Sequence, residues 1–277
     1  MHLFTKVSGL CSEITTKNYS TSFSSAIKLL HKDLQQHIYN IYGFVRFADE
    51  IVDTFHDYDK STLLHEFKQS TFEAIERRIS LNPILNSFQS TVNYYCIDLK
   101  LINDFFNSMQ LDLYKQQYDH KEYEAYIYGS AETVGLMCLY VFCEGDSNMF
   151  EQLRSYAQSL GAAFQKVNFL RDMKNDFEKL NRVYFPHIDE ENFSDDDKQK
   201  IERHIQRDFD HAYKGIVKLP VKARFGVYVA YKYYLSLFKK IQKLQPRYVK
   251  KQRIRIPNYS KVFIVAKAGV RSQLNIL

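Results

Sequence analysis

The chain has 277 residues, of which 45% are apolar and 25% are charged, and it contains 21 Tyr, 21 Phe and no Trp. This composition is typical of a globular protein and excludes a disordered or collagen-like chain. The net charge is +6, and eight basic residues with no acidic residue lie between Arg247 and Arg271. Such a stretch is either a solvated tail or a surface for phosphate groups or a membrane. No nucleic-acid-binding motif accompanies it, so we expect no nucleic acid partner.

Helical periodicity runs through most of the chain. Only 9 Gly and 5 Pro interrupt the sequence, which is too few for the many tight turns of an all-β or α/β protein. No repeat or linker divides the sequence, so we predict an all-α fold that forms one domain over residues 1–277. The predicted helices are, in chain order, Phe23–Leu30, Asp33–Thr54, Ser61–Ser80, Pro83–Cys96, Leu99–Tyr114, Lys121–Cys143, Asn148–Leu180, Ser194–Gly215, Val221–Leu244 and Tyr259–Leu274.

The cysteines and the N-terminus indicate the cellular setting. The four cysteines follow the spacing of neither a zinc site nor a disulfide framework, so we expect reduced, mostly buried thiols. The N-terminus lacks the basic start and apolar run of a signal peptide. The longest strongly apolar stretch, Val134–Cys143, is too short to cross a bilayer. We therefore expect a cytoplasmic protein whose membrane contact, if it has one, is peripheral and on the inner membrane face.

A stripe of polar side chains follows one face of the predicted helix around His37–Thr54. Its members are spaced by four, three and four residues and therefore share one side of a helix: Tyr42, Arg46, Asp49 and Asp53. Apolar residues fill most other positions and leave little room for a second solvent-facing surface. We therefore expect the carboxylates to face a wet cavity. A buried Arg–Asp pair or a solvated helix edge is the structural alternative.

A second polar stripe lies within Gly161–Asp176. Gln165, Asn168, Asp172 and Asp176 fall within about a third of the helix circumference, and apolar residues flank them. A glycine one turn before the stripe would allow close approach of a neighbouring helix or ligand.

Four aspartates on two inward-facing stripes require positive charge between them, because burying an unpaired carboxylate is costly. Lysine and arginine side chains could supply that charge. Oxygen-only ligands at one-turn spacing, without His or Cys, favour Mg²⁺ or Mn²⁺ over zinc. Mg²⁺ commonly binds one or two carboxylates and shares its other positions with water and substrate phosphates. The two stripes therefore predict a magnesium–diphosphate site.

These segments resemble the squalene/phytoene synthase family. The segment Asp49–Asp53 and the segment Gln165–Asp172, which continues to Asp176, are similar to the two aspartate-rich motifs of that family. Further similarity covers Tyr19–Phe23, Tyr128–Gly135 and Asn181–Pro186, and it becomes weaker beyond residue 186. Two residues depart from the family pattern. Glu50 stands where many members have Asp, and Glu132, whose carboxylate could alter the pocket or pair with a base, stands where a small residue is common.

The resemblance implies an isoprenoid-synthase helical bundle with a central cavity, and a magnesium-dependent prenyltransferase that acts on prenyl diphosphates. The implied metal ligands are Asp49, Asp53, Asn168, Asp172 and Asp176. Tyr42 and Arg46 would join the four aspartates in catalysis. The implied substrate contacts are Phe23, Arg46, Tyr128, Val134, Gly135, Gln165, Asn168, Arg171, Tyr184, Arg253 and Arg255.

The reaction implied by the resemblance is head-to-head condensation of two geranylgeranyl diphosphates to phytoene, through a cyclopropyl intermediate, prephytoene diphosphate. A squalene or dehydrosqualene synthase that uses farnesyl diphosphate is the main alternative. NADPH is expected only if squalene is the product. A non-catalytic scaffold relative and a terpene cyclase are further alternatives. Retention of all four aspartates disfavours the scaffold, and two aspartate pairs preceded by Gln and Asn fit a head-to-head enzyme better than a cyclase.

Overall fold

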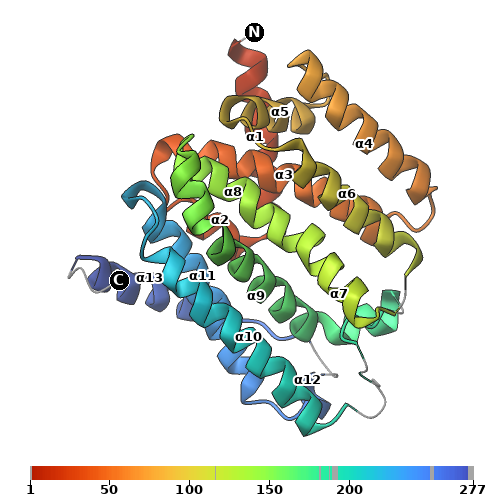
Figure 1. Ribbon diagram of the computed structural model, residues 1–277, viewed down its shortest axis with the longest axis vertical. Coiled ribbons are helices and arrows are strands. Elements are labelled where there is room, and N and C mark those ends of the chain that lie inside the picture. The colour runs from red at the N-terminus through yellow and green to blue at the C-terminus, as the bar shows by residue number, and fades with distance from the viewer. Residues whose placement is uncertain are drawn as a thin grey trace.

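The computed structural model describes residues 2–115, 117–180, 182–186, 188, 193–249 and 253–273. These residues form helices and, apart from one isolated bridge between Gln117 and Val183, no β-structure. The predicted all-α fold is therefore confirmed. The elements in Figure 1 are α1 (His2–Tyr19), α2 (Thr21–Ile27), α3 (Lys32–Thr54), α4 (Lys60–Arg77), α5 (Pro83–Tyr95), α6 (Leu99–Tyr114), α7 (His120–Ile127), η1 (Tyr128–Glu132), α8 (Thr133–Cys143), α9 (Ser147–Leu180), α10 (Asp195–Ile216), α11 (Val221–Gln242), α12 (Pro246–Val249) and α13 (Asn258–Gln273).

The predicted helices that lie in the described residues begin and end within three residues of the observed ones; the expected end at Leu274 lies outside the described residues. Local capping explains the agreement. Asn82 caps the start of α5, where Pro83 takes the first helical position, and Asp119 forms a capping box with Glu122 at the start of α7. These signals are visible in the sequence because they depend on residues close together in the chain.

Five helices form a closed ring around the centre of the protein. Helix α3 packs against α8, α8 against α9, α9 against α11, α11 against α2, and α2 against α3. Helix α10 packs against α9 and α11, and Figure 1 shows it lying along them. The two helices that carry the polar stripes, α3 and α9, are thus members of the same ring.

Aromatic packing fixes helix α3 in the ring. The Phe44 ring of α3 stacks on Phe88 of α5 with 3.8 Å between centroids, and it also contacts Phe105 and Phe106 of α6. All four side chains are fully buried, and each stabilises the fold by about 1.5–3 kcal/mol through burial. The first polar stripe therefore lies on a helix whose opposite side is held firmly in the core.

Helix α1 was not among the predicted helices, and its packing explains why. Its buried residues are small and mostly polar: Ser8, Gly9, Ser12 and Thr16. Ser12 shares a hydrogen bond of 2.7 Å with Ser87 of α5. Its apolar residues Leu3, Val7, Leu10 and Ile14 are exposed instead. Because apolar periodicity normally marks the buried face of a helix, the usual reading of the pattern fails here.

Helices α7, η1 and α8 form one continuous helical run, His120–Cys143. This run is longer than the apolar stretch expected from the sequence, and it is long and apolar enough to cross a membrane. However, 61% of its most apolar window is buried inside the protein, as is typical of a core helix. The cysteines are free, as expected, but Cys143 is buried, Cys11 and Cys138 are partly buried and Cys96 is exposed, so the expectation of mostly buried thiols is wrong.

Candidate active site

One cavity of about 520 Å³ lies inside the helical ring. Its lining on α3 begins at Ile38 and ends at Asp53, and its lining on α9 begins at Leu153 and ends at Asp176. Along both helices the lining residues change from apolar to charged. Since a helix rises 1.5 Å per residue, the lining on α3 extends about 22 Å. The cavity therefore suits an elongated molecule with one charged end and one apolar end.

The first aspartate pair lies at the charged end of the cavity. Burial, followed by the charge of Asp53, raises the pKa of Asp49 to about 7. Arg46 is 3.9 Å from Asp49, but it forms a direct ion pair with Glu50, and its guanidinium lies 4.4 Å from the centroid of the Tyr19 ring. Because Arg46 is shared with Glu50, it compensates the negative charge of the aspartate pair only in part.

The second aspartate pair faces the first from α9. Nε of Arg171 donates to Asp172 at 3.0 Å, and Nε of Arg253 lies 2.8 Å from the same carboxylate. Burial, followed by the charges of Asp172 and Asp53, raises the pKa of Asp176 to about 8. The charge of Asp53 thus acts on Asp176 from the other polar stripe, and both carboxylates line the same cavity.

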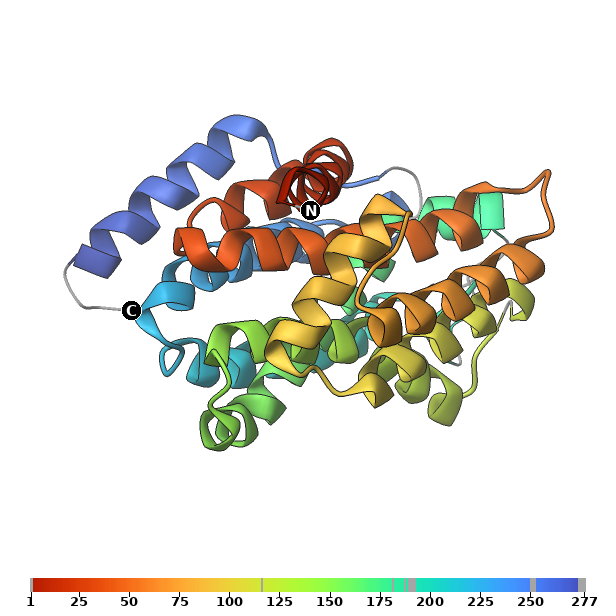
Figure 2. The same ribbon diagram turned by 90° about the horizontal axis from the view of Figure 1, so that it is seen from above.

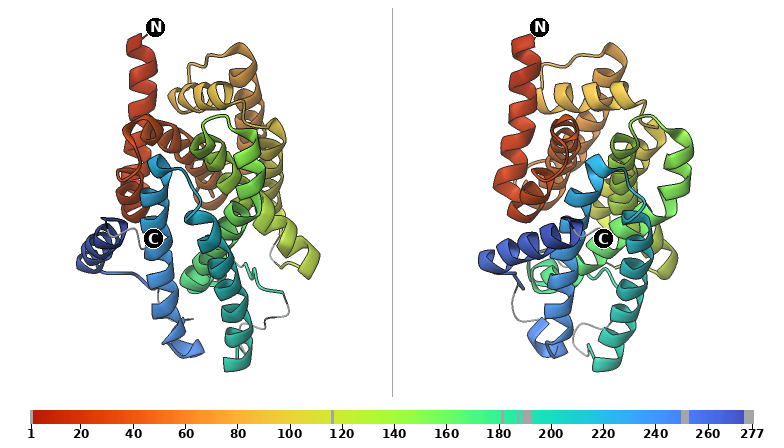
Figure 3. Two further views of the ribbon diagram at one scale, coloured as in Figure 1. Left: turned by 60° about the vertical axis from the view of Figure 1, so that its left-hand side comes forward. Right: turned by 90° about the vertical axis from the view of Figure 1, so that its left-hand side faces the viewer.

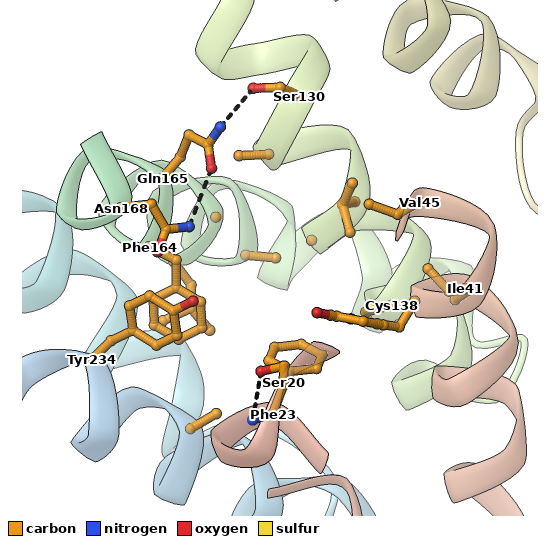
Figure 4. A pocket seen from close by; sticks show the side chains of 18 of the residues that line it. Ser20, Phe23, Ile41, Val45, Ser130, Cys138, Phe164, Gln165, Asn168 and Tyr234 are labelled. Atoms are coloured by element: carbon orange, nitrogen blue, oxygen red, sulfur yellow. Dashed lines mark hydrogen bonds between the residues drawn. The ribbon is translucent and has the colours of Figure 1, made fainter. Parts of the chain in front are cut away.

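The amides of the second stripe form a short hydrogen-bonded chain, drawn in Figure 4. Gln165 donates to Ser130 of η1 at 3.5 Å and accepts from Asn168 at 3.4 Å. The other end of the Asn168 amide, Oδ1, is buried and has no hydrogen-bond partner. An unsatisfied buried acceptor costs about 1–3 kcal/mol, so this oxygen indicates a position where a ligand or ion would be stabilising.

The donor set at the charged end fits a hydrated Mg²⁺ ion. It consists only of oxygen ligands, from Asp49, Asp53, Asn168, Asp172 and Asp176. Burial, and after it the neighbouring carboxylates, raises the pKa values of Asp49 and Asp176, and a divalent cation would stabilise the charged form of both. In the described part of the chain, no three His, Cys, Asp or Glu side chains are close enough to hold a metal ion by themselves. An ion held at this end would therefore need further oxygen ligands from water or substrate.

Aromatic rings line the walls next to the charged end. The Phe164 ring stacks on Tyr234 with 3.9 Å between centroids, and the Phe23 ring lies 5.3 Å from Tyr42. Figure 4 shows the Phe164–Tyr234 pair and Phe23 projecting into the same space from different helices. Burial raises the pKa of Tyr42 to about 12, so its hydroxyl stays neutral. Ring faces of this kind favour positive charge and exclude water.

The sequence relationship agrees with this geometry. The family model described as squalene/phytoene synthase matches residues 16–260. The chain belongs to the squalene/phytoene synthase family. The resemblance seen in the two aspartate motifs is thus confirmed, and with it, at the level of the family, the prediction of a prenyltransferase.

Named relatives span several members of the squalene/phytoene synthase family. The chain is 27% identical over 251 residues to phytoene synthase 1, chloroplastic, of Solanum lycopersicum, which covers 83% of this chain and 59% of that protein. It is 26% identical over 292 residues to the phytoene synthase of Arthrospira platensis, with 96% and 93% covered. It is 26% identical over 175 residues to the 4,4'-diapophytoene synthase of Staphylococcus haemolyticus, with 61% and 59% covered. The chain thus spans less than two thirds of the first and third of these proteins.

A solved structure shows the same fold. The crystal structure of a dehydrosqualene synthase in complex with a ligand superposes with a TM-score of 0.82 at 19% identity, and the match covers 97% of this chain and 98% of that one. The predicted isoprenoid-synthase helical bundle with a central cavity is therefore confirmed.

Most of the residues assigned through the family line the cavity. They are Phe23, Tyr42, Arg46, Asp49, Asp53, Val134, Gly135, Gln165, Asn168, Arg171, Asp172, Asp176, Tyr184 and Arg253. Two assigned residues do not line it: Tyr128, whose ring lies 6.0 Å from Nζ of Lys100, and Arg255, which is exposed. Tyr128 opens the five-residue π-helical turn η1, and the wider turn rotates the following residues relative to a regular helix. Arg255 lies in the extended segment before α13, where the family likeness is weak.

Glu132, a departure from the family pattern, also lies outside the cavity lining. It accepts a hydrogen bond of 2.9 Å from Gln158 of α9, and burial raises the pKa of its carboxyl. Its hydrogen-bond partner is therefore an amide of the neighbouring helix, and the charge of Lys166 also acts on its carboxyl; its effect on the pocket stays a prediction.

A buried network that the sequence analysis missed holds the first motif in place. Arg182, in the loop after α9, donates to Asp53 at 3.0 Å and to the backbone carbonyl of Asp112 at 2.7 Å. The Asp112 carboxylate accepts from the hydroxyls of Tyr118 and Tyr126 at 2.9 and 2.6 Å. Burial raises its pKa to about 6. The network therefore connects α3, α6 and the loop that follows the second motif.

One sequence signal could have revealed part of this network. Asp112 follows Phe105 and Met109 on the buried face of α6, where a single acidic residue among apolar ones requires a buried partner. Arg182 lies inside the Asn181–Pro186 segment that resembles the family, but no role was assigned to it.

Proposed function

We propose that this chain condenses two geranylgeranyl diphosphates head to head to phytoene, through prephytoene diphosphate, in a Mg²⁺-dependent reaction. The observation that carries the proposal is that Asp49 and Asp53 face Asp172 and Asp176 across one end of a cavity whose other end is apolar. Diphosphate groups suit the acidic end in the presence of divalent cations, and prenyl tails suit the apolar end. In this proposal residues 1–277 act as a single domain.

The polar side chains at the acidic end have two proposed roles, metal binding and phosphate binding. The residues that would hold Mg²⁺ are Asp49, Asp53, Asn168, Asp172 and Asp176. Bound Mg²⁺ supplies compensation for the negative charge that develops on a departing diphosphate. Arg46, Arg171 and Arg253 line the same end, where their guanidinium groups would donate forked hydrogen bonds to phosphate oxygens.

The aromatic walls act on the carbon skeleton. Departure of diphosphate leaves an allylic cation, and the ring faces of Phe23, Tyr42, Phe164 and Tyr234 would stabilise that positive charge. The neutral Tyr42 hydroxyl also limits attack on the cation, because a tyrosinate at this position would be a competing nucleophile. The surrounding apolar lining would keep bulk water away until the second substrate has reacted.

A reaction on the shorter farnesyl diphosphate is the second candidate. It is favoured by the relative named 4,4'-diapophytoene synthase, whose identity to this chain is close to that of the phytoene synthases. In that case the final step would be proton loss, or reduction by NADPH if the product were squalene.

Product analysis will distinguish these candidates. We expect purified protein with Mg²⁺ to convert geranylgeranyl diphosphate to phytoene, because the cavity has one end for diphosphates and one for prenyl tails. No NADPH should be needed, because phytoene forms without a reduction step. The measurement is chromatographic product analysis with C15 or C20 diphosphate, each with and without NADPH. Squalene formed only with NADPH, or dehydrosqualene from the C15 substrate alone, would replace the proposed substrate. An absence of product with either donor would favour a non-catalytic relative.

Removing divalent cations should stop the reaction. Treatment with a chelator is expected to abolish turnover, since four aspartates at one end of the cavity would repel both diphosphates without a cation. Adding Mg²⁺ or Mn²⁺ back should restore the rate, and the rate should be measured against metal concentration. Full turnover in the presence of excess chelator would contradict the assignment of a metal site.

A further inference from the structure

Helix α13 is apolar on two opposite faces. Ile264 and Val265 pack against the core, where α13 contacts α11. The other side of the helix carries three exposed apolar side chains: Tyr259 (77% exposed), Val262 (71%) and Phe263 (69%). Val262 and Phe263 follow Tyr259 by three and four residues, so the three side chains share one face. An exposed apolar face opposite the buried one marks an interaction surface. The outer face of α13, defined by Tyr259, Val262 and Phe263, therefore lacks a partner in the isolated chain.

The surrounding charge indicates what would cover the outer face. The eight basic residues between Arg247 and Arg271 have no acidic residue among them. Of these, Arg255, in the segment before α13, and Lys267, on α13, are exposed in the structure. A second copy of the chain packed on this face would bring two basic segments together, which is unfavourable. Exposed aromatic residues beside lysine and arginine are instead the composition of helices that lie at the surface of anionic bilayers.

The position of α13 connects its outer face to the cavity wall. Nζ of Lys261 donates to Oγ1 of Thr21 at 2.7 Å, next to Ser20, which lines the cavity. Arg253, five residues before α13, bonds Asp172 at the charged end. Figures 2 and 3 show α13 at the periphery of the molecule, on the same flank as α1 and α2. The segment is thus attached to the cavity wall at two points while its outer face points away from the core.

We propose that the outer face of α13 docks the protein on an anionic lipid bilayer, with the helix parallel to the membrane plane. Tyr259, Val262 and Phe263 enter the headgroup region, and Arg255 and Lys267 pair with anionic headgroups. This docking is independent of the reaction proposed above, because it involves residues outside the catalytic cavity.

Vesicle binding tests the docking surface. Purified protein is sedimented with vesicles of phosphatidylcholine alone, or of phosphatidylcholine mixed with phosphatidylglycerol. We expect binding to the mixed vesicles only, and weaker binding at high salt, because screening reduces the attraction of exposed charges. The double variant Val262→Ser/Phe263→Ser should bind at least about tenfold more weakly, since it removes two large apolar contacts with the interface.

A matched control uses exposed apolar residues elsewhere. Leu81 and Val221 are 91% and 81% exposed, so Leu81→Ser/Val221→Ser removes a similar exposed apolar surface and should leave vesicle binding unchanged. The size of the protein in solution is measured for each variant by sedimentation. Three results would overturn the proposal: no binding of the wild type to either vesicle, equal binding by the Val262→Ser/Phe263→Ser variant, or a dimer that this variant dissociates while vesicle binding persists.

Discussion

Replacement of Asp172 by Asn is expected to abolish turnover, with a loss of at least about a thousandfold in kcat. Asp172 lies at the charged end of the cavity and is the carboxylate that both Arg171 and Arg253 contact. Asparagine keeps the shape of the side chain but loses the charge, so it can neither hold the two guanidinium groups nor bind a divalent cation as strongly. The measurement is steady-state kinetics at saturating Mg²⁺, with circular dichroism to confirm that the fold is retained.

The control for this substitution is Asp208→Asn. Asp208 forms an ion pair of 2.7 Å with Lys166, and the exposed fractions of the two aspartate side chains are similar, 22% for Asp208 and 18% for Asp172. Because Asp208 does not line the cavity, its variant should keep nearly normal turnover. Near-normal rates in Asp172→Asn would contradict the metal assignment, and equal losses in both variants would indicate a general effect of removing an ion pair.

The largest effect on stability is expected from Arg182→Met. The side chains of Arg182 and Asp112 are 6% and 5% exposed, and the substitution leaves the Asp112 carboxylate buried without its cation. Breaking a buried pair in this way costs about 3–5 kcal/mol. The free energy of unfolding is measured by urea denaturation. Turnover should also fall in this variant, because Arg182 holds Asp53 in place.

Two further variants separate the buried charge from a loss of packing. Arg154→Met removes an exposed arginine that is paired only with Glu151, and it should change stability by no more than about 0.5 kcal/mol. The double variant Arg182→Met/Asp112→Asn should lose less free energy of unfolding than the two single variants lose together, because it contains no unpaired buried charge. If Arg182→Met lowers the free energy of unfolding by less than about 1 kcal/mol, water or another cation compensates the charge of Asp112.

The sequence predicted those parts of the site that depend on periodicity within one helix. Asp49 and Asp53, and Asp172 and Asp176, share a helix face because they are one turn apart, and surrounding apolar residues indicate that this face is inward. The prediction that the two stripes face one cavity required that both helices belong to one core. The fold provides this through the ring of α2, α3, α8, α9 and α11.

The features that the sequence did not reveal depend on contacts between distant segments. The link from Arg182 to Asp53 spans 129 residues, and no local pattern encodes it. The π-helical turn at Tyr128 changes the helical period for one turn only, where Gly129 lies so close to α6 that an added Cβ would be 2.1 Å from Oγ of Ser108. Tyr128 was assigned to the cavity through the family resemblance, whereas in the structure Ser130 and Ala131 of the same turn line the cavity.

The small, polar buried face of α1 has a consequence for how the cavity is closed. The hydroxyls of Ser12 and Ser87 share a buried hydrogen bond at this interface, and such groups can bond to water when they are exposed. A helix attached in this way can open locally at a lower free energy than the aromatic core. Tyr19 and Ser20, at the end of α1, line the cavity. One part of the cavity wall is therefore continuous with a helix that is held by small and polar side chains, whereas α3 is held by the aromatic core.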